Sequence, residues 1–152
     1  MKNIIKDFVS EFSFFGSLPF YVFISIFVLL LGETNLFYLL AVGLFFCYFF
    51  AISIRLFYFK SRPKAVKYKN VIGKIIASSF PSVHSWQIAM LTIFFTFYYS
   101  SLIFLILFGL LSLMVFFSRY HLKKHFVSDI VFGALFGVVE SLTVLLIWYK
   151  GF

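Results

Sequence analysis

The stretch from Ser118 to Asp129 reads SRYHLKKHFVSD and separates two apolar runs, at about 102–117 and 126–149. It holds an arginine, two histidines and an aspartate in a chain in which only 12% of the residues are charged. The flanking runs approach or exceed the roughly 20 residues that a helix needs to cross a bilayer. The sequence therefore predicts two membrane-spanning helices joined by a short polar segment at one membrane face.

The composition assigns the rest of the chain to the same environment. Of its 152 residues 63% are hydrophobic and 26 are phenylalanine, and the mean hydropathy is +1.07. A soluble domain of this size cannot bury so much apolar surface, so a bilayer must solvate much of it. The two-residue alternation of a membrane barrel is absent. We therefore expect an all-α integral membrane helical bundle that forms one domain over residues 1–152.

Five apolar runs predict about five transmembrane helices. They cover about 14–31, 36–59, 82–99, 102–117 and 126–149. Residues 1–13 are expected to lie along the membrane surface, and the basic, partly apolar segment 64–78 is expected to form an interfacial helix. Because successive spans alternate in direction, the N-terminus and the segments 60–79 and 118–128 should share one membrane face.

The charge is concentrated on that face. The formal net charge is +8, and nearly all lysine and arginine falls in the segments assigned there. In a membrane protein such clustering indicates a cytoplasmic face or an anionic ligand rather than nucleic acid. We expect the plasma (inner) membrane, and the side that carries the site stays open. The single cysteine, Cys47, cannot form an internal disulfide.

The opening stretch also contains candidate chemistry. His125 and Asp129 are four residues apart, so they would share a face if the helix that follows reached back to His125. A carboxylate beside an imidazole fixes which ring nitrogen carries the proton and raises the basicity of the other. Arg119 could hold an anion against that second nitrogen.

Two further clusters precede this stretch. Arg55 and Arg62 lie at the end of the second run and offer forked donors suited to phosphoryl oxygens. Ser82 follows a proline and is a candidate N-cap, so the backbone N–H of Val83 would belong to an anion-binding helix start. His84 lies in the same turn and could act as a general acid.

These clusters together resemble the type 2 phosphatidic acid phosphatase family, also called the lipid phosphate phosphatases. The family pattern is Lys-x6-Arg-Pro, then Pro-Ser-Gly-His, then Ser-Arg-x5-His-x3-Asp. Here the three segments read RLFYFKSRP (55–63), PSVH (81–84) and SRYHLKKHFVSD (118–129). The third matches at every defined position, and the resemblance covers about residues 55–137.

The resemblance implies a function and a role for each residue. His125 would attack phosphorus and become a phosphohistidine, Asp129 would orient His125, and His84 would protonate the leaving group. The phosphoryl oxygens would be held by Arg55, Arg62, Arg119, Ser82 and the backbone N–H of Val83. No metal ion or other cofactor is implied. The substrate would be a lipid phosphate, such as a polyprenyl (undecaprenyl) diphosphate, phosphatidic acid, phosphatidylglycerophosphate or a lipid A phosphate.

Two positions depart from the family pattern. Arg55 stands where the pattern has lysine, so a compact ammonium charge is replaced by a guanidinium with forked donors. Val83 replaces a glycine, and a β-branched residue resists a positive φ. The second departure leaves open a non-catalytic lipid-phosphate-binding or transport protein. A vanadate-dependent haloperoxidase shares these motifs but has a larger, soluble build.

The fifth run carries two further features. Glu140 lies deep inside it, and we expect it to form a structural hydrogen bond within the bundle. Gly133 and Gly137 are spaced to let another helix approach closely, which we interpret as internal packing.

Overall fold

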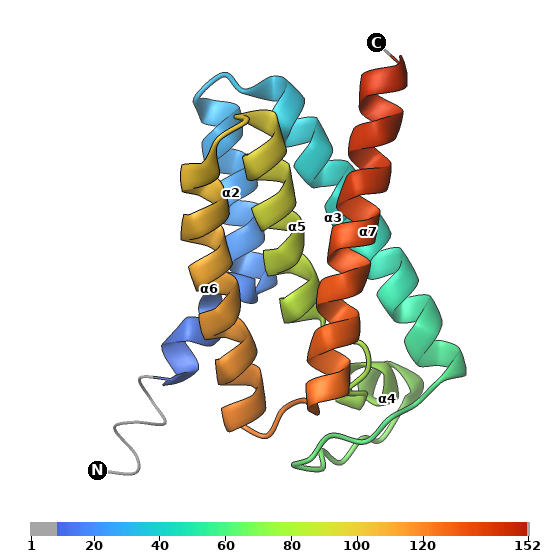
Figure 1. Ribbon diagram of the computed structural model, residues 1–152. Coiled ribbons are helices and arrows are strands. Elements are labelled where there is room, and N and C mark those ends of the chain that lie inside the picture. Colours follow the sequence, from blue (N-terminus) through green and yellow to red (C-terminus); the bar gives the residue numbers. More distant parts are fainter. Residues whose placement is uncertain (1–8, 152) are drawn as a thin grey trace.

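The computed structural model describes residues 9–151 as a bundle of helices in which no strand occurs (Figure 1). Its elements are η1 (Ser13–Gly16), α2 (Leu18–Leu30), α3 (Thr34–Phe57), α4 (Val71–Ala77), α5 (Val83–Tyr98), α6 (Leu102–His121) and α7 (Val127–Gly151). Each of the five apolar runs forms a helix, in the expected order. The all-α membrane bundle is therefore confirmed.

The helices differ in how much of a bilayer they could cross. By length and composition α3, α6 and α7 can each span a membrane, with 24, 20 and 25 residues. A fourth span would join residues 9–16 to α2 across a bend of 52°. The central helix α5 has only 16 residues, slightly fewer than the ~17 that a span requires. The described chain thus has three full-length spans, or four with the bent pair, and α5 completes the bundle as a shorter helix.

Helix α5 is short because protein rather than lipid surrounds most of it. It packs against α3, α6 and α7, and Figure 1 shows it in the middle of the bundle. Ile88, Met90, Leu91 and Phe94 are all fully buried. A helix that is apolar on every side is expected in the interior of a bundle. Its three neighbours therefore hold α5, including its first turn, in place.

The connections alternate between the two ends of the bundle, as expected from the spans. In Figure 1 the α2–α3 and α5–α6 turns lie at the end with the C-terminus, whereas α4 and the α6–α7 connection lie at the opposite end. Helix α4 exposes Val71, Ile72 and Ile76, as an interfacial helix would. The segments that carry the three motifs therefore meet at one end.

The N-terminal segment differs in part from the expectation. Residues 1–8 lie outside the described part of the chain. Residues 9–13 do not lie along a free surface, because Val9 and Ser13 are buried and the backbone carbonyl of Val9 accepts a hydrogen bond from the Ser118 hydroxyl on α6. This segment is part of the bundle, because the buried Val9 side chain and the hydrogen bonds of Val9 and Ser13 with Ser118 hold it against α6.

Glycines set the distance between α5 and α7. A Cβ atom on Gly133 would lie within 2.4 Å of the Ser82 carbonyl oxygen, and one on Gly137 would lie 2.5 Å from that of Trp86. Any side chain at these positions would collide with backbone, which cannot move aside cheaply. The expected internal packing role of the two glycines agrees with these contacts.

We predict that Gly137→Ala destabilises the bundle, because the new methyl group must push α7 away from α5. The expected cost is about 1–3 kcal/mol, the usual range for overpacking. It would be measured as a lower midpoint of thermal unfolding in detergent. Gly109→Ala is the matched control, since a Cβ at this α6 position meets nothing within 4 Å. Equal midpoints for the two variants would contradict the packing role.

Candidate active site

His125 lies in the connection between α6 and α7 and is only 2% exposed. Its Nδ1 donates a hydrogen bond to the Ser79 carbonyl oxygen at 2.6 Å, because a carbonyl oxygen can only accept. The proton therefore resides on Nδ1, and Nε2 is unprotonated. Nε2 accepts a hydrogen bond from Arg119 Nη2 at 3.3 Å. An imidazole held in this tautomer can act as a nucleophile through Nε2.

The end of α6 explains how His125 comes to lie over Arg119. The backbone N–H groups of Lys124 and His125 both point to the Arg119 carbonyl oxygen, at 3.2 and 3.4 Å. Lys123 adopts φ +54° and its N–H bonds to the Tyr120 carbonyl oxygen. A left-handed residue at a helix C-terminus turns the chain back on itself. The turn thus brings Arg119 and His125, six residues apart in the sequence, into direct contact.

Asp129 does not make the contact expected of it. Its carboxylate is 0% exposed, and its partners in the described structure are Lys60 Nζ at 2.6 Å and the backbone N–H of Phe126 at 2.9 Å. The expected hydrogen bond from His125 to Asp129 is wrong because α7 begins at Val127, so His125 is not in its first turn. The spacing rule for helix faces therefore does not apply to this pair.

Arg119 and Arg62 both carry donors that are buried and unpartnered. Arg119 is 4% exposed, and its Nη1 donates to the Ser13 hydroxyl at 3.2 Å. Arg62 donates through Nη2 to the Ile76 carbonyl oxygen at 2.7 Å. In both guanidinium groups the Nε–H is buried and has no hydrogen-bond partner among the residues that the structure describes. Such a donor is costly to leave unsatisfied, so the arrangement favours an acceptor-rich ligand such as a phosphoryl group.

Arg55 has a different role in the described structure. It donates to the carbonyl oxygens of Pro81, Phe80 and Ile75, at 2.8, 3.4 and 3.5 Å. Its fork supports the turn that leads into α5, a set of contacts that the single point charge of a lysine could not make at once. Its expected contact with phosphate stays a prediction.

The start of α5 holds the second motif. The Ser82 hydroxyl caps the helix by accepting from the N–H and hydroxyl of Ser85, and the Ser82 N–H donates to the Asp129 carbonyl oxygen at 3.0 Å. Val83 is the first helical residue and is not among the described residues with a positive φ. Its β-branched side chain therefore causes no backbone strain. His84 follows in the same turn and is half-buried.

Burial and neighbouring cations determine the charge of His125. Burial lowers its pKa to about 2, with further lowering by Arg119, Arg62 and His84, against the Ser79 hydrogen bond. Burial and the charges of Arg119 and Arg62 also lower the pKa of Lys124. The His125 imidazole is therefore neutral, and residues from all three motifs surround it.

The positive charge of this site is not balanced by protein groups. Over residues 9–151 the one ion pair joins Lys60 to Asp129, and none involves the three arginines. A cleft of about 800 Å³ opens beside His125, and its lining contains His121 and Lys123 but no acidic residue. An anion is the ligand that this charge distribution requires.

Comparisons with known proteins agree with the motifs. Residues 32–152 match the PAP2 superfamily. The chain belongs to the PAP2 superfamily. A search of curated proteins finds no match. Among solved structures the crystal structure of Aquifex aeolicus LpxE is similar, with a TM-score of 0.78 and 19% sequence identity over 93% of this chain and 86% of that one. The PAP2 resemblance inferred from the three motifs is confirmed, and the family supports a membrane lipid phosphatase.

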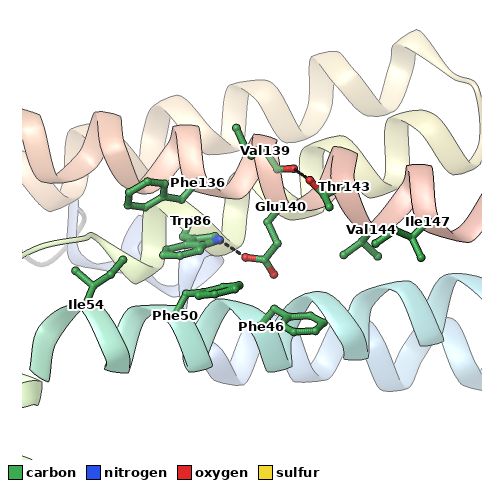
Figure 2. Close-up of a pocket in the computed structure, with 10 residues that line it drawn as sticks. All are labelled: Phe46, Phe50, Ile54, Trp86, Phe136, Val139, Glu140, Thr143, Val144 and Ile147. Carbon is green, nitrogen blue, oxygen red and sulfur yellow. Dashed lines mark hydrogen bonds between the residues drawn. The ribbon is translucent and has the colours of Figure 1, made fainter.

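This PAP2 chain also contains an intramembrane groove between α3, α5 and α7. The groove has a volume of about 470 Å³, and Figure 2 shows Phe46 and Phe50 of α3 opposite Trp86 and Phe136. Trp86 donates its indole N–H to the Glu140 carboxylate at 2.7 Å, which is the structural hydrogen bond expected for Glu140. The groove is apolar and of a size typical of ligand pockets, ~300–1,000 Å³.

Sequence reasoning missed two residues of the site. Ser79 contributes a backbone carbonyl, which leaves no signal in side-chain identity. Lys60 lies inside the first motif, two residues before Arg62, where the pattern defines no residue type. The sequence offers one clue to the role of Lys60. Asp129 is the sole acid among the motif residues, so its negative charge requires a nearby cation.

We predict that acid destabilises the folded chain through His125. An unfolded histidine binds its proton near pH 6.5, whereas folded His125 stays neutral to about pH 2, so stability is retained above pH 6.5 and lost as the pH falls below it. The loss due to His125 at pH 5 is roughly 2 kcal/mol.

Thermal unfolding of the parent and of His125→Asn at pH 7.5 and pH 5 measures this loss. Asparagine cannot take up a proton, so the variant should lose less thermal stability between the two pH values. Other titrating groups contribute equally to both proteins. A parallel decrease in both would show that His125 is not the titrating group.

Proposed function

We propose that this PAP2 chain hydrolyses a phosphate ester or anhydride of a membrane lipid through a phosphohistidine on His125. One observation carries the proposal: Ser79 holds the Nδ1 proton, and the unprotonated Nε2 accepts a hydrogen bond from the Arg119 guanidinium, where a phosphoryl group held by that arginine would lie next to it. A buried nucleophile next to unsatisfied guanidinium donors is suited to attack on a phosphoryl group held by those donors.

The reaction would proceed in two displacements. The Nε2 lone pair of His125 forms a bond to phosphorus as the bond to the lipid oxygen, or to the bridging oxygen of a diphosphate, breaks. In the free protein, burial and the nearby cations lower the pKa of His84 to about 3. The bound phosphoryl dianion favours the protonated form of His84, which then gives its proton to that oxygen. Water then attacks the phosphohistidine, His84 takes up a proton from it, and phosphate leaves. Arg62 and Arg119 stabilise the negative charge on the phosphoryl oxygens in both steps, and we expect no metal ion to take part.

The groove between α3, α5 and α7 supports a lipid as the substrate. Its lining includes Ile54 and Trp86, which are one residue before Arg55 and four after Ser82, so the groove extends toward the motif-bearing end of the bundle. A hydrocarbon chain in the groove would place its headgroup beside the arginines. Polyprenyl diphosphate, phosphatidic acid, phosphatidylglycerophosphate and lipid A phosphate all fit this description. Phosphate release from a panel of these lipids in detergent distinguishes them.

A non-catalytic lipid-phosphate-binding protein is less well supported. That alternative depends on the replacement of glycine by Val83, and Val83 adopts an ordinary helical start in the described structure. We also propose that the protein resides in the plasma (inner) membrane.

We predict that His125→Ala abolishes phosphate release, lowering kcat at least about 10³-fold, because the nucleophile is lost. The parent should incorporate ³²P from labelled substrate into an acid-labile, base-stable adduct, and the variant should not. Activity should persist in EDTA. Lys67→Ala is the control, since Lys67 is exposed in the connection between α3 and α4 and does not line the cleft beside His125. Phosphate release by His125→Ala at the parental rate would disprove the mechanism.

We predict that Thr143→Trp, which fills the groove, raises KM for a long-chain lipid phosphate several-fold and leaves a short-chain, water-soluble phosphate ester unaffected. Thr143 lines the groove and is drawn in Figure 2. Leu113→Trp is the control, because Leu113 on α6 is exposed and lies away from the groove. Equal effects on both substrates would mean that the groove does not bind the chain.

A further inference from the structure

The N-terminal segment, residues 9–16, reaches the candidate active site through one serine. Ser13 is 9% exposed, and its hydroxyl oxygen accepts a hydrogen bond from Arg119 Nη1 at 3.2 Å. Within residues 9–151 the guanidinium makes one other hydrogen bond, from Nη2 to Nε2 of His125 at 3.3 Å. Arg119 is therefore held between the N-terminal segment on one side and the imidazole on the other.

The hydroxyl groups around Ser13 form a chain of hydrogen bonds whose direction is fixed. A hydroxyl has one hydrogen to donate. Ser118 donates its hydrogen to the Val9 carbonyl oxygen at 2.8 Å, so it must accept from Ser13, whose oxygen lies 2.8 Å away. The Ser13 oxygen in turn accepts from Arg119. The chain thus runs from Arg119 through Ser13 and Ser118 to Val9, and all four residues are buried.

Gly16 fixes the place of Ser13 from a second side. A Cβ atom on Gly16 would lie 2.8 Å from the backbone carbonyl oxygen of His84 and 2.8 Å from Cγ1 of Val115. The short helix η1 therefore touches the first turn of α5 and a side chain of α6, with no room for a side chain of its own at this point. Because the segment is confined between the two helices that carry His84 and Arg119, the Ser13 hydroxyl has a defined position relative to both.

The group that holds Arg119 is neutral. Over residues 9–151 no acidic side chain pairs with Arg119. A carboxylate at this place would also bind the guanidinium but would neutralise its charge. A hydroxyl instead fixes the direction of Nη1 and leaves the positive charge available, together with the buried Nε–H that has no partner in the described part of the chain. The arrangement orients the arginine without competing with an anionic ligand.

We propose that Ser13 is a positioning residue for phosphoryl binding: it orients the Arg119 guanidinium toward a phosphoryl group beside His125. This inference rests on the proposed function, in which Arg119 holds that group. The match to the PAP2 superfamily begins at residue 32, so the role falls to a residue outside the matched part of the chain.

Removal of the Ser13 hydroxyl has a specific consequence. In Ser13→Ala a second buried N–H of Arg119 loses its partner, and the guanidinium turns toward another acceptor or becomes mobile. A side chain that must be ordered when the ligand binds lowers the affinity for that ligand. Ser13→Ala should therefore weaken the binding of phosphate itself. A purely structural defect would reduce the amount of active protein, and with it kcat, but would leave KM and the inhibition constant of phosphate unchanged.

The test measures kcat, KM for a lipid phosphate and the inhibition constant of inorganic phosphate in the parent, Ser13→Ala and Ser25→Ala. We expect Ser13→Ala to raise KM and the inhibition constant about tenfold, the effect of one hydrogen bond to a charged group. Ser25→Ala is the matched control and should leave both constants unchanged, because Ser25 is buried too but donates to the Tyr21 carbonyl oxygen of its own helix.

A double variant tests whether Ser13 acts through Arg119. Arg119→Lys keeps the charge but has no Nη1 for Ser13 to hold. In that background Ser13→Ala should change neither constant further, because the interaction it removes is already absent.

Two outcomes would overturn the inference while leaving the proposed function intact. In the first, His125→Ala is inactive but Ser13→Ala has the same KM and inhibition constant as Ser25→Ala, whatever its thermal stability. In the second, Ser13→Ala raises both constants as much in the Arg119→Lys background as in the parent, so that Ser13 acts by another route. An active His125→Ala would instead count against the proposed function.

Discussion

One buried carboxylate joins the segments that form the site. Asp129 binds Lys60 of the first motif and Phe126 of the third through its side chain, and Ser82 of the second through its backbone carbonyl. Charge-assisted hydrogen bonds are strong where water is excluded, and an acid at 0% exposure must satisfy all of its acceptors. Three stretches far apart in the sequence are thereby fixed around His125.

Beside these neutral contacts of Asp129 lie the arginines, which have no acidic partner among residues 9–151. Within that part of the chain Arg62 and Arg119 each have a buried Nε–H without a hydrogen-bond partner, and burial keeps His125 uncharged. A protonated imidazole would repel the guanidinium groups and lose its nucleophilic lone pair. The neutral ring therefore allows the arginines and the imidazole to lie close together, and in the proposed reaction a phosphoryl dianion would supply the missing negative charge. In this way Asp129 is neutralised by Lys60, whereas the arginines stay free for a ligand.

The sequence predicted the fold and much of the site, for identifiable reasons. Apolar runs as long as those of α3, α6 and α7 have few alternatives to membrane helices, and the close approach at Gly133 followed from residue size. Arg119 was expected to hold an anion against the second ring nitrogen of His125, and its Nη2 lies 3.3 Å from that nitrogen. The contact of Asp129 with His125 was expected wrongly, because helix spacing was applied to a residue that precedes the helix start at Val127. The role of the Ser79 carbonyl has no counterpart in side-chain chemistry and required coordinates.

Helix α7 couples the membrane-embedded part of the molecule to the site. Its first turn carries Asp129, Gly133 allows it to contact the Ser82 carbonyl, and Glu140 bonds to Trp86 at the groove. Because α7 is rigid and touches α5 at backbone distance, a hydrocarbon chain that moved α7 outward would loosen the Ser82–Asp129 contact as well. In the proposed function the groove would therefore have to accept a chain without widening, and its aromatic lining between α3 and α7 suits that. Binding of the chain and alignment of His125 would then depend on the same contact between α5 and α7.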